Sequence, residues 1–219
     1  MIREIYIDNF RCLTNFRIEP GTYQLWLGDN GSGKTSTLDV LRSIQRLLRG
    51  EHIEDIFSIT SLTTWDRRDE QTIGFSLMID EEQYDYELII EYYHRENKAR
   101  IKREELKWKN STFFLFDGKD AHLYRINRDT NQVEKGTHFT ADWSRSIIAT
   151  IAKREDNLPL LRFREEINKW LIIQPVPLVV KQVADSEARN LSSHAENFAQ
   201  WYRHVLQEEP GSVPLVVKS

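Results

Sequence analysis

Nine residues near the start of the chain have the types and the spacing that phosphate binding requires. They run Gly28-Asp29-Asn30-Gly31-Ser32-Gly33-Lys34-Thr35-Ser36 and satisfy the P-loop pattern G-x-x-x-x-G-K-[ST] without a substitution. In this pattern the glycines let the backbone turn tightly around an anion, the lysine reaches the outer phosphates, and the next hydroxyl can ligate Mg²⁺. The stretch therefore predicts a site for a nucleoside triphosphate.

The residues on both sides of this loop favour the context that a P-loop needs. Residues 22–27 (TYQLWL) are predicted as a strand that runs into the loop, and residues 34–49 as an amphipathic helix that leaves it. Gly50 stands where a glycine commonly ends a helix. Phosphates would then lie at the N-terminal end of a helix, where unpaired N–H groups and the helix dipole favour negative charge. The alternative is a glycine-rich turn that matches the pattern by chance.

The composition narrows the class of protein. A chain of 219 residues that is 40% hydrophobic and 29% charged can form one large domain, or a core with a small subdomain. No apolar run approaches the roughly 20 residues of a membrane span, and the first residues lack the pattern of a signal peptide. We therefore expect a cytoplasmic protein without a membrane partner. The net charge of −4, with both signs interspersed, neither supports nor excludes DNA binding.

Cysteine and histidine usage argues against two kinds of site. Cys12 is the only cysteine, which excludes an internal disulfide and any C-x-x-C metal site. The six histidines are scattered, and no pair has the i, i+4 spacing that places two ligands on one helix face. Structural zinc is therefore not expected.

The middle of the chain has the period of strands. Residues 71–136 alternate apolar and polar positions in short segments between polar turns, which predicts an antiparallel meander with one exposed face. Residues 51–71, rich in Ser, Thr and charge, are predicted as a mobile connection with a solvated charge run. Residues 140–209 are predicted as a helical part, with Asn157 as a cap and Pro159 in a first turn.

One segment of the meander superficially matches a catalytic motif. Residues 75–81 (FSLMIDE) end in Asp80 and Glu81, as in a Walker B strand, where Asp holds Mg²⁺ and Glu polarises water. However, Ser76 is polar and the alternation is strict, which is typical of a half-exposed hairpin strand and not of a buried parallel one. We therefore do not assign Asp80 and Glu81 a catalytic role.

Elements ahead of the loop extend the pattern beyond the bare P-loop. Three short strands are predicted before it, and the run Ile7-Asp8-Asn9-Phe10-Arg11 precedes a Pro20-Gly21 turn. Together with the loop, these motifs resemble the start of an AAA-type ATPase of the ABC-like RecF/SMC/OLD group, in which an N-F-R element precedes a G-x-N-G-S-G-K-T loop. Ile101-Lys102-Arg103-Glu104-Glu105-Leu106 also resembles the I-x-x-E-x-L step of that group. The resemblance runs from about Ile2 to Glu209 and covers only the N-terminal lobe.

This resemblance implies a fold and a set of ligands. The fold would be α/β, the ABC-ATPase-like N-terminal lobe of a P-loop NTPase, with a mixed sheet that carries the loop, an antiparallel β-meander and flanking helices. Residues 1–219 would form a single nucleotide-binding lobe that binds ATP and Mg²⁺. Thr35 and Gln174 would lie at the metal, although Gln182 competes with Gln174 for this role. The residues placed at the nucleotide are Asn30, Gly31, Ser32, Gly33, Lys34, Thr35, Ser36 and Arg11. For Arg11 the alternative is a surface salt bridge.

The resemblance also implies partners. In this group two ATPase heads sandwich nucleotide, and the signature loop, the Walker B strand and the His switch come later in the chain. None of the three is convincing before Ser219, so we expect a need for a C-terminal lobe or a second head, with a dimer when complete. DNA or a nuclease would be a further partner by analogy, in DNA maintenance or phage defence. No residue is a secure catalytic candidate, so we expect weak or no hydrolysis by this chain alone.

Two other functions stay open. A complete small P-loop kinase suits the length, but the loop follows three predicted strands and the middle is a meander where such kinases alternate strand and helix. A non-hydrolysing switch would use nucleotide only to drive association. A GTPase is disfavoured because no N-K-x-D element occurs, since Asn168-Lys169-Trp170-Leu171 lacks the aspartate.

Overall fold

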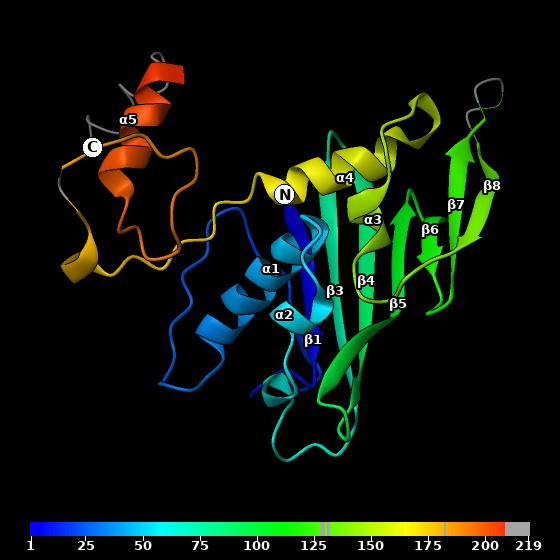
Figure 1. Ribbon diagram of the computed structural model, residues 1–219, viewed down its shortest axis with the longest axis horizontal. Helices are drawn as coiled ribbons and strands as arrows, with labels where there is room; N and C mark the ends of the chain where they lie inside the picture. Colours follow the sequence, from blue (N-terminus) through cyan, green and yellow to red (C-terminus); the bar gives the residue numbers. More distant parts are fainter. Residues whose placement is uncertain (128–129, 131, 182, 209–219) are drawn as a thin grey trace. The chain divides into compact units, whose positions relative to one another are not determined.

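An eight-stranded sheet with helices over one face forms most of the first part of the chain in a computed structural model, shown in Figure 1. The structure describes residues 1–127, 130, 132–181 and 183–208. The chain divides into two compact units, one from Met1 to Trp170 and one that begins at Leu171. In the part of the chain that is described, no helix is long and apolar enough to cross a membrane.

The sheet is antiparallel throughout, in the order β2-β1-β3-β4-β5-β6-β7-β8. Its strands are β1 (Ile2–Asp8), β2 (Phe16–Ile18), β3 (Glu70–Ile79), β4 (Glu82–Tyr93), β5 (Lys98–Trp108), β6 (Ser111–Phe116), β7 (Asp120–Ile126) and β8 (Val133–Thr140). Strands β3 to β8 follow one another in sequence and in space. The predicted meander is therefore confirmed, and the predicted mixed sheet is corrected to an antiparallel one.

Helices cover one face of this sheet. Every second side chain of the strands points to this face, most of these side chains are apolar, and the helices bury them. The helices are α1 (Lys34–Leu48), α2 (Ile53–Ile56), α3 (Ile147–Thr150) and α4 (Leu158–Asn168), with 3-10 turns η1 (Ile59–Ser61) and η2 (Glu155–Asn157). In β3 the alternation of buried and half-buried positions is unbroken. Phe163 of α4 stacks on Phe75 and Tyr86 of the sheet. Each such buried side chain contributes about 1.5–3 kcal/mol.

The other face of the sheet carries charged side chains that pair across neighbouring strands. Arg17 meets Glu4, and Arg100 meets Glu91, at 2.9 Å and 2.6 Å. Exposed pairs of this kind stabilise little, but they keep the face polar. This is the exposed face that the alternation predicted.

Residues 22–27, predicted as the strand before the phosphate loop, form no strand. Tyr23, Leu25 and Leu27 are 95%, 79% and 83% exposed. Their alternation is that of a strand, but a strand also needs a neighbour, and residues 22–27 pair with no strand of the described sheet. The expectation of a sheet that carries the loop is therefore wrong for the described residues.

The connection between α1 and the meander is more ordered than predicted. It contains α2 and η1, and Ser61 and Thr63 are buried. Arg68, from the charge run that was expected to be solvated, bonds Asp8 at 2.6 Å and Asp66 at 2.5 Å. The serines and threonines of this segment predict an exposed loop, but Ser61 and Thr63 face inward.

The predicted helical part is only partly helical. Asn157 precedes α4 and Pro159 stands in its first turn, as expected. Residues 151–154 are irregular. The second unit contains η3 (Pro177–Val179) and α5 (Phe198–Glu208). There Gln174, Val176 and Lys181 donate backbone N–H groups to the carbonyls of Ser193, His194 and Glu196. Residue 209, the predicted end of this part, lies outside the described residues.

A buried carboxyl ties β5 to the start of α3. Glu104 is fully buried and accepts hydrogen bonds from the hydroxyls of Ser146 at 2.6 Å and Tyr86 at 3.0 Å, and from the backbone N–H of Ile147 at 3.2 Å. Burial raises its pKa to about 7, although these hydrogen bonds oppose the rise. Glu104 is the glutamate of the I-x-x-E-x-L step, and here its role is structural.

This carboxyl predicts a decline of stability with pH. Because its pKa rises from 4.5 to about 7 on folding, the folded chain keeps a proton that the unfolded chain releases between these values. The free energy of unfolding should therefore fall by on the order of 3 kcal/mol from about pH 4.5 to about pH 7, and level off above. Urea unfolding across this range measures it.

Glu105 provides the matched control. It points to the charged face of the sheet but is itself buried, and although this burial works to raise its pKa, hydrogen bonds from Arg103 and Thr112 leave the pKa below its usual value. Glu104→Gln should flatten the decline, and Glu105→Gln should retain it. An equal decline in Glu104→Gln would mean that another group is responsible.

Candidate nucleotide-binding site

The predicted phosphate loop leads directly into the N-terminus of α1. Gly31 and Gly33 have φ values of 84° and 93°, in the left-handed region that favours glycine. Gly33 is the N-cap of α1 and no side chain caps the helix. The N–H groups of the first helical turn therefore lack an intrahelical partner, and the helix dipole adds positive potential there. An uncapped helix N-terminus of this kind favours negative charge.

Lys34 folds its side chain back over the loop. Its Nζ donates to the carbonyl oxygens of Gly28 at 2.6 Å and Asp29 at 2.8 Å, and to the Ser32 hydroxyl at 3.1 Å. A further backbone bond joins the Ser32 N–H to the Asp29 carbonyl at 3.2 Å. These bonds hold a full positive charge against the oxygen atoms of the loop itself. Asn30 and Gly31 lie exposed at its tip.

The two hydroxyl residues after Lys34 differ in their surroundings. Thr35 is exposed, whereas Ser36 is buried, with its Oγ 4.0 Å from the Cys12 sulfur. Thr37, one residue on, donates its hydroxyl to the Gly33 carbonyl at 3.1 Å. The described residues contain no group of three His, Cys, Asp or Glu that could hold a metal ion. Thr35 directly follows Lys34, at the position whose hydroxyl ligates Mg²⁺ in the P-loop pattern, and its role there stays a prediction.

Gln174, the predicted magnesium sensor, belongs to the second unit. It is exposed, and its backbone N–H donates to the Ser193 carbonyl at 2.7 Å. Its role stays a prediction. Gln182, the competing candidate, lies outside the described residues.

The N-F-R element packs against the end of the phosphate loop. A Cβ added to Gly33 would meet the Leu13 side chain at 2.5 Å and the Cys12 sulfur at 3.4 Å. Two backbone hydrogen bonds between Phe10 and Leu13 close this turn, and Arg11 pairs with Asp39 of α1 at 2.6 Å. The structure therefore brings Arg11 to the same helix as Lys34. It also shows the surface salt bridge that was its alternative role.

Buried amides whose structural roles the sequence analysis did not predict hold the N-F-R turn in place. Asn9 is fully buried with a φ of 59°, and its Nδ2 donates to the carbonyls of Arg68 at 2.9 Å and Glu70 at 2.8 Å. Gln71, also buried, donates to the carbonyls of Asn9 at 2.9 Å and Ser61 at 3.0 Å. An asparagine that directly follows a strand was the available signal for such a turn.

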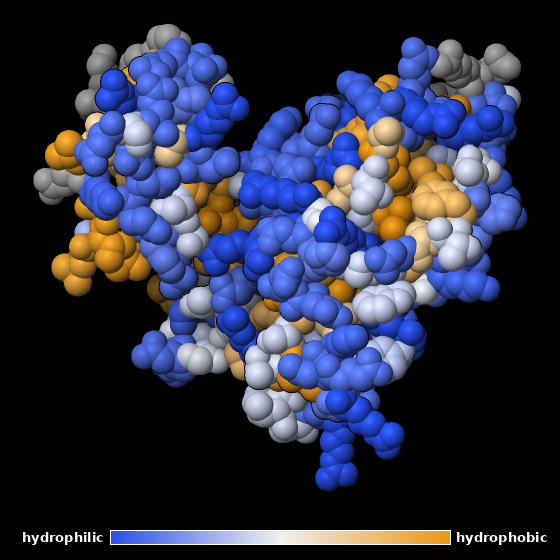
Figure 2. Space-filling view, in the orientation of Figure 1, coloured by the Kyte–Doolittle hydropathy of each residue, from blue (hydrophilic) through white to orange (hydrophobic). Residues whose placement is uncertain are grey.

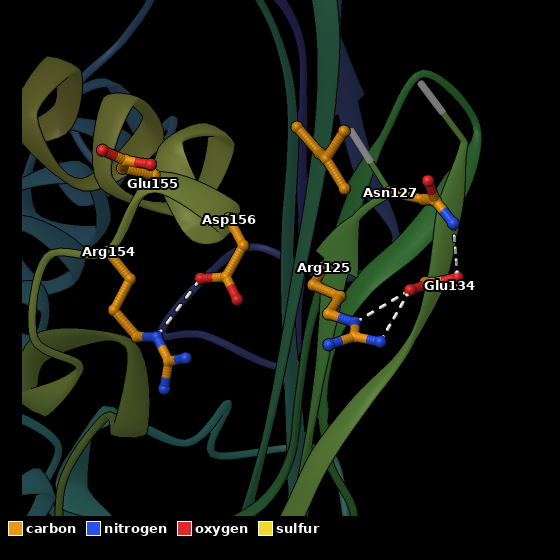
Figure 3. A pocket seen from close by; sticks show the side chains of 7 residues that line it. Arg125, Asn127, Glu134, Arg154, Glu155 and Asp156 are labelled. Atoms are coloured by element: carbon orange, nitrogen blue, oxygen red, sulfur yellow. Dashed lines mark hydrogen bonds and ion pairs between the residues drawn. The ribbon is translucent and has the colours of Figure 1, made fainter. Parts of the chain in front are cut away.

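A separate hollow lies at the other end of the sheet and holds none of the predicted site residues. About 380 Å³ in volume, it lies between the β7–β8 hairpin and residues 154–156 (Figure 3). Arg125 bonds Glu134 at 2.9 Å and Arg154 bonds Asp156 at 3.3 Å. Both guanidinium groups in it are therefore already neutralised by carboxylates. Figure 2 shows apolar side chains beside it, between the helices and the last strands.

Two comparisons with known proteins found no match. No protein-family model matches the chain, and no curated protein matches it.

The two left-handed glycines predict different costs for the same substitution. Gly31→Ala adds a methyl group in open space, so only backbone strain of about 1 kcal/mol is expected. Gly33→Ala also drives the methyl group into Leu13, and should lower the free energy of unfolding by about 2–4 kcal/mol. Urea unfolding of both variants measures the difference. Equal losses would show that the contact between the turn and the loop does not constrain Gly33.

Proposed function

We propose that this chain is the ATP-binding N-terminal part of an ABC-like AAA ATPase of the P-loop NTPase class. The observation that carries the proposal is the lysine held over a loop of left-handed glycines at the uncapped start of α1. Helix N-termini with this arrangement bind phosphate through backbone N–H groups, a positive side chain and the helix dipole.

The loop residues have distinct roles in this proposal. Backbone N–H groups of residues 30–36 surround the phosphates, and Lys34 leaves the carbonyls of Gly28 and Asp29 to bind the outer ones. Thr35 ligates Mg²⁺, which supplies positive charge that offsets the phosphates when bound. Ser36 lies near the inner phosphates, and Arg11 adds a guanidinium from the neighbouring turn. Gln174 is retained as a candidate metal contact.

In this proposal, hydrolysis needs groups beyond the phosphate loop, and no residue of this chain is a secure candidate for them. A water must be oriented and the charge of the transition state stabilised. Asp80 and Glu81 lie exposed in the β3–β4 turn with positive φ values, as expected for a hairpin. The proposal therefore includes a C-terminal lobe or a second head, in the cytoplasm, with DNA or a nuclease as a partner by analogy alone.

A specific observation favours one second candidate, a nucleotide-driven assembly switch. Tyr23, Leu25 and Leu27 expose a row of apolar side chains directly before the loop, and such a row is typical of an interaction surface. In this case Mg·ATP should raise the mass of the particle without turnover, as measured by sedimentation.

The kinase alternative is disfavoured, because an antiparallel sheet lacks the alternation of parallel strands and helices.

Binding of Mg·ATP should depend on Lys34. We expect calorimetry to detect Mg·ATP binding by the unchanged protein and none by Lys34→Ala at the same concentrations, because the charge that faces the phosphates is lost. Lys119→Ala, at an exposed lysine in the β6–β7 turn, is the control and should bind normally. No heat of binding for the unchanged protein would refute the proposed function.

Turnover by this chain alone should be negligible. Single-turnover assays with radiolabelled Mg·ATP and excess protein should give a rate far below the roughly 1 s⁻¹ or more of ordinary enzymes. A rate in the ordinary range that Lys34→Ala abolishes would mean that the chain contains a complete catalytic site.

A further inference from the structure

Asp39 of α1 joins two arginines beside the proposed nucleotide site. Its Oδ2 accepts a hydrogen bond from Arg11 Nη1 at 2.6 Å, and its Oδ1 accepts one from Arg42 Nη1 at 2.8 Å. Each carboxylate oxygen therefore serves one guanidinium. Because Asp39 follows Thr35 by four residues in the same helix, it lies on the face of α1 that carries the hydroxyls of the loop.

The backbone of the N-F-R turn fixes where the Arg11 side chain begins. Arg11 has a φ of 53°, and its N–H donates to the Ser61 carbonyl at 2.7 Å. That carbonyl also accepts from Gln71, whose side chain is buried. The turn is therefore rigid, but a long side chain would still lose about 2 kcal/mol of rotamer entropy when it is ordered. The contacts of Arg11 with Asp39 and with the Phe10 ring, whose centroid lies 5.1 Å from the guanidinium, order this side chain in the free protein. The rotamer entropy is therefore lost before any ligand binds.

Arg42 makes this arrangement compatible with a negatively charged ligand. A carboxylate alone beside phosphates would repel them. Here Asp39 is paired with Arg42, whose Nε and Nη2 are buried without a hydrogen-bond partner within the described residues. The trio of Arg11, Asp39 and Arg42 has a net charge of +1, and Arg11 is its most exposed member, at 47% against 24% and 25% for the others.

We propose that Asp39 is a positioning residue that holds the Arg11 guanidinium ready for the phosphates of the nucleotide. One bond to Asp39 uses Nη1 of Arg11, and a planar guanidinium has further N–H groups for a second acceptor. Asp39 thus orients Arg11 without competing for all of its donors. This inference rests on the proposed function, because it concerns the same nucleotide.

A double-mutant cycle on Mg·ATP affinity tests it. Arg11→Ala and Asp39→Asn should each weaken binding by about five- to tenfold, and the double variant should be no weaker than Arg11→Ala alone. Thermal unfolding of each variant is followed in parallel, since a structural role alone would lower the melting temperature without this coupling in affinity.

Two further variants keep the test decisive. Glu51→Gln breaks the ion pair of Glu51 with Arg46, whose nitrogen lies 2.6 Å away at the far end of α1, and should leave the affinity unchanged. If Asp39→Asn fails to fold because Arg42 loses its counter-charge, Asp39→Asn combined with Arg42→Gln removes both charges. This pair should weaken Mg·ATP binding to the same extent.

The outcomes separate this inference from the proposed function. The role of Asp39 would be overturned if Asp39→Asn bound Mg·ATP normally or more tightly, or if the losses in the double variant were additive. The proposed function would still stand in either case, provided that Lys34→Ala abolishes binding. No binding by the unchanged protein would overturn both.

Discussion

The arrangement of the site depends on burying the polar backbone of one turn, from Asn9 to Leu13. Asn9 and Arg11 both adopt positive φ values, which cost about 1–3 kcal/mol each for residues other than glycine. The Asn9 side chain offsets this cost with two hydrogen bonds that it donates and one that it accepts, from the Thr63 N–H at 3.1 Å. A buried amide with every bond made is rigid, whereas one left unpaired would destabilise the fold.

This rigidity extends to the phosphate loop through packing. Leu13, at the end of the turn, lies where a side chain on Gly33 would otherwise be. Gly33 in turn sets the first residue of α1, and Asp39 connects that helix back to Arg11. The loop, the helix and the arginine are therefore positioned by one contiguous set of contacts. Tyr92, which donates to Gln71 at 2.6 Å, links the same set to the meander.

The sequence predicted those parts of the structure that depend on local pattern. The alternation from Ile73 to Ile79 predicted β3 and its neighbours in an antiparallel meander, and the loop with its helix followed from glycine and lysine spacing. The roles of Asn9 and Gln71 could not be predicted, because their partners lie far along the chain or in irregular segments. The same holds for Ser61 and Thr63, whose types are common in exposed loops but which here face the core.

Residues 22–27 show the opposite limit, where a local pattern predicted a strand that the structure does not form. The alternation of Tyr23, Leu25 and Leu27 is that of a strand, yet without a neighbouring strand these side chains remain exposed.

The proposed phosphate loop is consequently held on its helix side by contacts of Gly33 and Lys34, whereas Leu27 on its other side is 83% exposed. A loop whose binding-competent form is only partly populated binds its ligand more weakly in proportion to that population. If the proposed nucleotide binding is correct, ordering residues 22–27 against a partner would strengthen it, and by reciprocity bound nucleotide would strengthen the association with that partner.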